Sequence, residues 1–214
     1  MKYRTLIQLA LAVAAVLTLG ACQQITQGPR PLPEQAIGVA QFTQPTHTWD
    51  LLAGYIPDGQ PKVDDKVLRD LDESFETLLF RQTKRRYVSS GASTRCLEMD
   101  MRKRNGSTTA LETWLDVGRC MKVDLLIVPH ILAWKERDGG DMGTFIPSAV
   151  TMDIFVVDIV KERVSARYHF EETQENLASN LMNFDKFMER KGKWITARQL
   201  AEEGMRTGIK ELGL

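Results

Sequence analysis

The most apolar run of the chain lies near its amino terminus, between residues 6 and 19. Lys2 and Arg4 precede this run, and small residues follow it. A membrane-spanning helix needs about 20 consecutive apolar residues, and this run is shorter. We therefore expect residues 1–21 to be a secretory signal peptide that is removed from the mature protein.

Beyond residue 35, the pattern of apolar and polar positions predicts strands alternating with helices. Ala36 to Phe42 is an apolar first strand, and a long loop from Thr43 to Lys62 follows it. Apolar residues at helical spacing predict a helix from Val63 to Lys84. Tyr87 to Ala92 fits a short second strand, and a basic, irregular stretch then extends over residues 93–106.

The middle of the chain predicts a second helix and a central strand. The helix begins near Thr109, because the spacing of Thr109 and Glu112 fits a capping box. The apolar, β-branched segment from Val123 to Trp134 predicts the strand. Pro129 lies inside this segment and has no N–H to donate, which indicates a bulge or an edge position there.

The clearest pattern is a hairpin formed by Ala149 to Val160 and Val164 to Glu172. In its second half, apolar and polar residues alternate from Val164 onwards, which is typical of a strand with one solvated face. We therefore place Val164, Ala166, Tyr168 and Phe170 on the buried face.

A last helix starts at Thr196, and Gly204 and Gly208 let it pack closely on a neighbouring element. Taken together, the elements predict an α/β fold of the α+β type. We expect a mixed sheet of about five strands with a late antiparallel hairpin, packed by about three helices.

The residues Leu19-Gly20-Ala21-Cys22 resemble the bacterial lipobox. This resemblance implies transfer of a diacylglyceryl group to Cys22, cleavage between Ala21 and Cys22, and N-acylation of the new terminus. Gln23, in place of aspartate, resembles an outer-membrane sorting signal in enteric bacteria. The alternative is an ordinary signal peptide followed by a chance cysteine.

Composition is consistent with one globular domain over residues 36–214, joined to the anchor by a proline-bearing tether of residues 22–35. Of the 214 residues, 43% are hydrophobic and 26% are charged, which suffices for a buried core. The formal net charge is zero. Because general nucleic-acid binding needs a basic surface, we expect no nucleic-acid partner.

Two cysteines remain once Cys22 carries lipid. Cys96 and Cys120 form an even pair in an oxidising compartment, which favours a disulfide. The alternative is two buried thiols. Without clustered histidines, the pair does not make a zinc site, and we expect no metal or cofactor.

The sequence contains no recognisable catalytic motif. Its histidines are His47, His130 and His169. His169 precedes Glu171 and Glu172 and could be drawn as a base with an orienting carboxylate, but a solvated hairpin shows the same arrangement. We interpret His130, in an apolar strand, as a hydrogen-bonded core residue. These residues predict that the protein is not an enzyme.

The loop from Thr43 to Lys62 is longer than typical connections and carries large apolar side chains. Such loops often bind partners, although they can also cap a core. We assign a candidate partner-binding role to Trp49, Leu52, Tyr55 and Ile56.

The order of elements, the strand start Val123-Asp124-Leu125-Leu126 and the aspartate Asp158 before the hairpin turn resemble a periplasmic α/β domain. Penicillin-binding-protein activator lipoproteins, the amino-terminal domain of the Tol β-propeller protein and the curli secretion lipoprotein share that domain. The turn lacks the Thr-Gly that often follows the aspartate. The segment from Phe170 to Thr196 is similar to uncharacterised lipoproteins of δ-proteobacterial type.

These resemblances imply a non-enzymatic envelope protein, in agreement with the missing motifs. We expect a lipid-anchored protein on the periplasmic face of the outer membrane that binds another envelope protein or the cell wall. The alternatives are a subunit of an oligomeric secretion or pore complex and an envelope hydrolase.

Overall fold

A computed structural model of the chain describes residues 35–103, 108–140, 143–174, 188, 190 and 193–214. The predicted signal peptide, the cleavage site at Ala21 and Cys22, and all but the last residue of the tether lie outside these residues. Within the described residues, the main sheet has four strands in the order β1-β2-β5-β6, in which β1 runs parallel to β2 and the other pairs are antiparallel. The α/β fold class predicted from the sequence is confirmed.

The strands are β1 (Ile37–Val39), β2 (Leu125–Lys135), β5 (Ala149–Asp158) and β6 (Arg163–Thr173), with β3 (Asp138–Gly140) and β4 (Gly143–Ile146) in a separate two-stranded ribbon. The helices are η1 (Thr48–Asp50), α2 (Asp65–Thr83), α3 (Ser90–Lys103), α4 (Ala110–Met121) and α6 (Ala197–Glu211). None of the helices in the described ranges is both long and apolar enough to cross a membrane.

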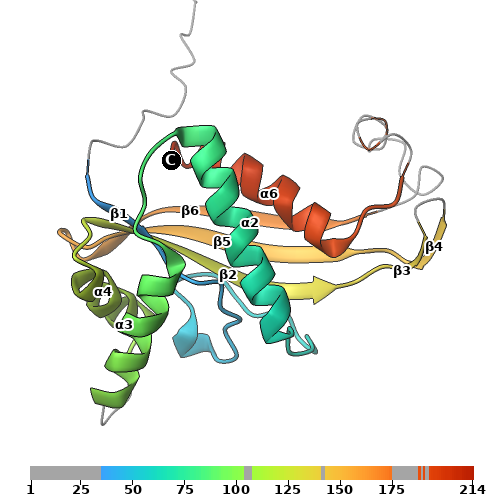
Figure 1. The fold of residues 1–214 in the computed structure, drawn as a ribbon. Helices are drawn as coiled ribbons and strands as arrows, with labels where there is room; N and C mark the ends of the chain where they lie inside the picture. Colours follow the sequence, from blue (N-terminus) through green and yellow to red (C-terminus); the bar gives the residue numbers. More distant parts are fainter. Residues whose placement is uncertain (1–34, 104–107, 141–142, 175–187, 189, 191–192) are drawn as a thin grey trace, which may run out of the picture. The chain divides into compact units, whose positions relative to one another are not determined.

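Helices α2 and α6 lie side by side over one face of the sheet (Figure 1). The side chain of Asp64 caps α2 by accepting a hydrogen bond from the N–H of Lys66 at 2.7 Å. Along α2, Leu71, Phe75 and Leu79 recur at four-residue spacing and are completely buried, so one stripe of the helix meets the sheet.

The two glycines of α6 allow its close approach to β5 and β6. A Cβ at Gly204 would meet the side chains of Met152 and Phe170, and one at Gly208 would lie 2.6 Å from Tyr168. The close packing predicted at these glycines is confirmed.

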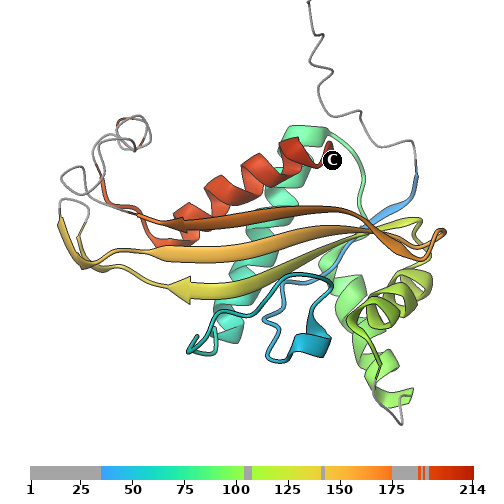
Figure 2. The ribbon, with the colours of Figure 1, turned by 180° about the vertical axis from the view of Figure 1, so that it is seen from behind.

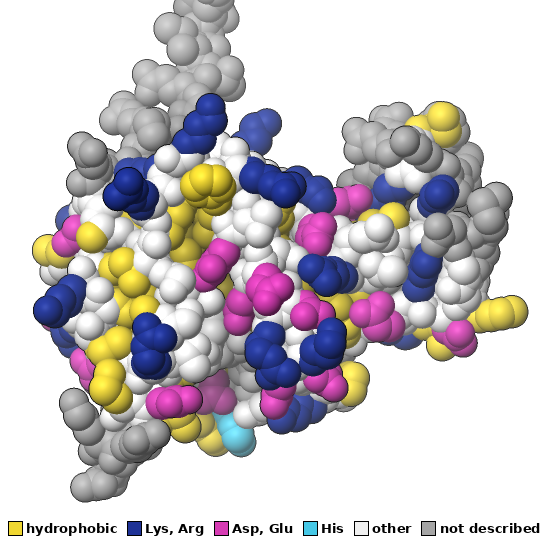
Figure 3. Space-filling view, in the orientation of Figure 1, with side chains coloured by type: hydrophobic (Ala, Val, Ile, Leu, Met, Phe, Trp, Pro, Cys, Tyr) yellow, Lys and Arg dark blue, Asp and Glu magenta, His cyan; other side chains and the backbone are white. Residues whose placement is uncertain are grey.

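The outer surface of α2 and α6 carries acidic and basic side chains in alternation (Figure 3). Lys66 pairs with Asp70 at 2.9 Å, and Glu202 pairs with Arg198 at 3.4 Å and with Arg206 at 3.7 Å. Each basic side chain of this network thus lies beside an acidic one.

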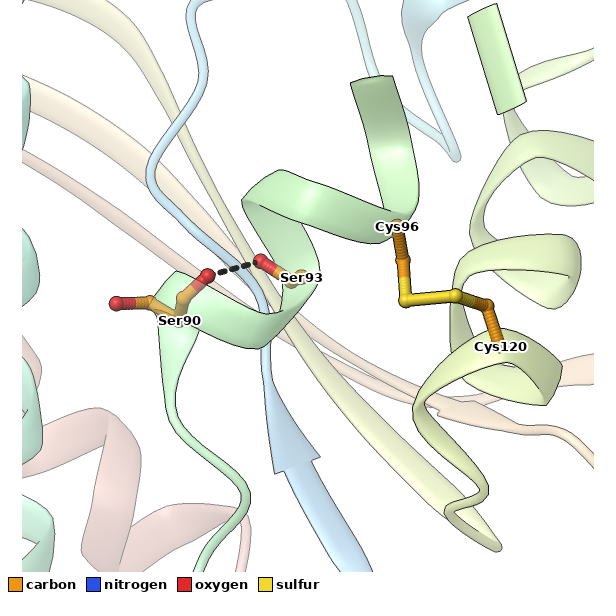
Figure 4. Close-up of a disulfide and its surroundings, with 4 residues drawn as sticks. All are labelled: Ser90, Ser93, Cys96 and Cys120. Atoms are coloured by element: carbon orange, nitrogen blue, oxygen red, sulfur yellow. Dashed lines mark hydrogen bonds between the residues drawn. A yellow bond between two sulfur atoms is a disulfide. The ribbon is translucent and has the colours of Figure 1, made fainter. Parts of the chain in front are cut away.

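The other face of the sheet is covered by α3 and α4 at one end and by the loop of residues 43–62 beside them (Figure 2). Trp114 and Val117 of α4 pack there against Val128 of β2 and Phe155 of β5. A disulfide joins Cys96 of α3 to Cys120 of α4, with a Cα–Cα distance of 5.8 Å. Figure 4 shows this bond bridging the two helices.

Two expectations for residues 87–106 are wrong. Of the predicted strand over 87–92, only Val88 joins the sheet, as an isolated bridge to Gly38. Helix α3 begins two residues later and occupies most of the stretch expected to be irregular. The N–H of Ser90 donates to the Glu76 carboxylate of α2 at 2.6 Å, and the Ser93 hydroxyl accepts from the N–H of Gln41 at 2.9 Å. Long-range contacts therefore support this helix.

Pro129 occupies an interior strand, and the bulge between β2 and β5 lies between Ile131 and Ala133 instead. The carbonyl of Pro129 accepts from the N–H of Thr43 at 3.3 Å, on the side facing the chain beyond β1. Since the N and O atoms of one strand residue face the same neighbour, the missing N–H of Pro129 also lies on that side. The ladder to β5 therefore loses no donor.

Val164 also departs from the prediction. β6 is bulged between its pairings Val157–Val164 and Val156–Ala166, which leaves Ser165 unpaired. As a result Val164 packs against the α3–α4 side, whereas Ala166 and the following apolar residues pack under α6.

Candidate functional site

The loop of residues 43–62 is ordered by its own hydrogen bonds. At its base, the Gln44 side chain donates to the carbonyl of Pro61 at 3.0 Å and accepts from the N–H of Val63 at 2.7 Å. At its tip, the Asp50 carboxylate accepts from the N–H of His47 at 3.0 Å. The loop therefore presents its side chains from a defined backbone.

Of the four side chains assigned to partner binding, two are exposed and two are half-buried. Trp49 and Tyr55 are 59% and 58% exposed. The Trp49 ring stacks on His47, with ring centroids 4.4 Å apart. Leu52 packs against the buried cluster beneath α4, and Ile56 is half-buried in the loop. Leu52 thus helps to fix the loop on the domain, whereas the two aromatic rings face outwards.

A cavity of about 390 Å³ lies between this loop, α3, α4 and β2. Its walls include Trp49 from the loop, Leu97 and Met101 from α3, and Trp114 from α4, and His130 of β2 lines it as well. We call it the His130 cavity. Met101 is 68% exposed and Trp49 is 59% exposed, so the apolar lining continues onto the outer surface.

His130 is the most unusual residue of this cavity. Its side chain is 1% exposed and lies between aromatic rings, 6.1 Å from Trp114 and 5.5 Å from Phe155 between centroids. Burial lowers the pKa of His130 to about 4, although the charges of Asp153 and Asp50 act in the opposite direction. The imidazole is therefore neutral near pH 7.

No described residue hydrogen-bonds to Nδ1 of His130. The sequence correctly placed this side chain in the core, but the expectation that its hydrogen bonds are made there is wrong. Buried polar groups are satisfied in the large majority of cases, so this exception marks the cavity as the candidate site.

A row of polar residues crosses the same face of the sheet. His130, Asp153 and His169 are directly opposite one another on β2, β5 and β6. Asp153 is fully buried. Its carboxylate accepts two hydrogen bonds from Arg167, at 3.1 and 3.0 Å, and lies 2.8 Å from Nδ1 of His169. The Asp153 carboxylate is therefore bonded to Arg167 and His169, and His130 lies outside this network.

The hydrogen-bonding partners of His169 do not form a hydrolytic triad. Asp153 orients its ring, but Nε2 lies 3.5 Å from the Glu171 carboxylate, and no described hydroxyl or thiol bonds to it. A triad needs a nucleophile at that position. Within the described ranges, no three histidine, cysteine or acidic side chains are grouped so as to hold a metal ion.

The sequence did not reveal the pairing of Asp153 with Arg167 and His169. The predicted hairpin could have indicated this pairing, because residues on paired strands face each other at predictable positions. However, the bulge at Ser165 shifts those positions by one residue. The local sequence pattern gives no sign of this bulge.

No family model matches the chain, and no curated protein matches it. Three solved structures similar to it are a LpoB C-terminal domain from Escherichia coli, a PelC dodecamer from Paraburkholderia phytofirmans and the lipoprotein GNA1162 from Neisseria meningitidis. The first is 9% identical with a TM-score of 0.38, covering 65% of this chain and 83% of its own. The second is 10% identical with a TM-score of 0.43, covering 88% and 95%. The third is 10% identical with a TM-score of 0.39, covering 73% and 97%. Likenesses of this degree concern the path of the chain alone.

Proposed function

We propose that this chain is a lipid-anchored protein of the bacterial cell envelope that binds another envelope component and catalyses no reaction. The observation that carries the proposal is the His130 cavity, with its apolar rim of exposed Trp49 and Met101. Tryptophan, tyrosine and methionine are enriched where proteins bind other proteins. The loop of residues 43–62 and α3 are then the partner-binding surface.

Anchoring depends on Cys22 and on the lipobox-like residues before it. Each buried methylene of an acyl chain contributes about 0.8 kcal/mol to membrane attachment, so several chains on one cysteine hold the protein durably. Metabolic labelling with a radioactive fatty acid is expected to mark the wild-type protein and to leave the Cys22→Ser variant unmarked. Equal labelling of both would contradict the anchor.

The absence of catalysis is supported by the bonding of His169 to the buried Asp153. Asp153 and His169 are joined, but the free side of His169 faces Glu171 rather than a nucleophile. We expect the mature protein to leave envelope polymers intact. An activity on peptidoglycan that is lost in His169→Ala would overturn this part of the proposal.

Partner binding is tested by crosslinking in living cells. A photoreactive residue at Trp49 or at Tyr55 is expected to capture the same envelope protein. The matched control is Phe80, which is 71% exposed on α2, over the other face of the sheet. Products of equal yield from Phe80, or no product from the two loop positions, would refute the assigned surface.

A further inference from the structure

We infer that the His130 cavity receives one uncharged aromatic side chain of the partner, whose single polar atom hydrogen-bonds to His130. This inference rests on the proposed partner-binding function and specifies the chemistry of the group that enters the site. It follows from the unsatisfied imidazole, the lining of the cavity and the surface around its mouth.

No residue in the described part of the chain donates a hydrogen bond to Nδ1 of His130 or accepts one from it. The adjacent rings belong to Trp114 and Phe155. Asp153, opposite on β5, already binds Arg167 and His169. A buried polar atom without a partner is destabilising. Nδ1 of His130 has almost no exposed area, so an entering group reaches it only when side chains that line the cavity move apart. The hydrogen bond formed then adds to the free energy of binding.

The entering group is uncharged. His130 is neutral near pH 7, so its Nδ1 is either an acceptor or an N–H donor, depending on the tautomer, and the ring has no charge to balance an ion. Asp50 also lines the cavity, but its carboxylate accepts from the N–H groups of Thr46 and His47. Asp100, on the α3 side, also interacts within the chain, although its buried Oδ2 makes no hydrogen bond to a described residue.

The size and lining of the cavity fit one aromatic ring. Sites for small ligands span about 300–1,000 Å³, and 390 Å³ is at the lower end of that range. Trp114 and Trp49 offer ring contacts, and the thioether of Met101 offers a sulfur–aromatic contact. A tyrosine or tryptophan buried in such a place needs a partner for its O–H or N–H, and His130 supplies one.

The mouth of the cavity favours a protein over a free small molecule as the source of this ring. Trp49 and Met101 extend the apolar lining onto exposed surface. A small molecule inside the cavity would leave these side chains in water. A partner whose ring enters the cavity would also cover them, which is how an aromatic anchor is placed at the centre of an interface.

The test uses amino-acid amides and the three histidines of the chain as reporters. The mature protein, in lipid nanodiscs and labelled with ¹⁵N-histidine, is titrated with N-acetyltyrosinamide, N-acetylphenylalaninamide and N-acetylleucinamide. We expect the tyrosine amide to shift the His130 resonances and to bind about three- to tenfold more tightly than the phenylalanine amide, the range of one net hydrogen bond. His169, which is bonded to Asp153, serves as the unaffected reference.

Two variants complete the experiment. In His130→Phe, the preference for tyrosine over phenylalanine is expected to disappear. In Leu97→Trp, the larger side chain fills the cavity, and neither aromatic amide should bind. Equal affinities of the two aromatic amides for the wild-type protein, or shifts at His169 as large as those at His130, would overturn the inference without requiring either variant to fold.

The failure of this inference is distinguishable from the failure of the proposed function. If Trp49 still captures an envelope partner while the amides show no preference, the partner binds the rim and the aromatic anchor is wrong. If the amides bind as expected but no loop position captures a protein, the partner-binding function is wrong.

Discussion

Replacing His130 by phenylalanine is expected to remove a strong pH dependence from the stability of the domain. Burial lowers the pKa of His130 to about 4 in the folded protein, whereas an unfolded chain gives histidine about 6.5. Below pH 6.5 the unfolded chain therefore takes up a proton that the folded domain does not. By linkage, the free energy of unfolding falls as the pH drops from about 6.5 to about 4. The full difference between the two pKa values corresponds to about 3 kcal/mol.

A second buried group acts in the opposite direction over part of this range. Burial raises the pKa of Asp72 to about 6, although the N–H of Phe42 donates to its carboxylate. A raised pKa means that the folded domain binds the proton more readily. The contribution of Asp72 is thus complete below about pH 3.8 and is lost as the pH rises through about 6. The wild-type profile alone therefore cannot isolate His130, and the comparison with His130→Phe can.

The assay is urea denaturation followed by tryptophan fluorescence at pH 7, 6, 5 and 4.5. Relative to the wild type, His130→Phe should become progressively more stable as the pH falls, by about 1.4 kcal/mol per pH unit at most. His47→Gln, at a mostly exposed histidine of the loop, is the matched control and should follow the wild type. Parallel profiles for His130→Phe and the wild type would refute the reasoning.

Three further changes test the packing around the site. Joint replacement of Cys96 and Cys120 by alanine opens a loop with a sequence separation of 24. In urea titrations, the free energy of unfolding should fall by about 3.5 kcal/mol. Unchanged stability would argue against the disulfide. Gly204→Val brings a side chain into contact with Met152 and Phe170, so thermal unfolding should show a loss of about 1–3 kcal/mol in the free energy of unfolding. In Gly140→Ala, the added Cβ meets no atom within 4 Å, so the loss of stability should be smaller. Asp153→Asn removes the buried charge that holds Arg167, and calorimetry should show a loss of about 1–3 kcal/mol.

The helices whose ends are set by neighbours in sequence could be predicted well. Thr109 and Thr196 each cap a helix through a contact three residues away, and capping residues are readable in the sequence. Helix α3 could not be predicted in this way. Its first N–H binds Glu76, and its Cys96 is bonded to α4, so its support comes from residues that only the folded chain brings near.

The candidate site was predicted in part for a similar reason. The exposed aromatic rings of the loop are visible as Trp49 and Tyr55 in a long connection. The unsatisfied His130 is not visible, because an apolar strand gives the same pattern whether or not its one polar side chain finds a partner. Whether His130 finds a hydrogen-bond partner depends on the residues opposite it in the sheet, and strand register determines which residues these are.

The bulge at Ser165 connects strand register to the cavity. Without the bulge, the pairing Val157–Val164 would continue and place Tyr168 opposite Asp153; with it, His169 takes that position. A shift of one residue moves every following side chain to the other face of a sheet. The bulge therefore keeps Tyr168 beneath Gly208 of α6 and brings His169 to the Asp153 carboxylate on the opposite face. Since Asp153 is then bound from the β6 side, the imidazole on β2 is left to bond with whatever enters the His130 cavity.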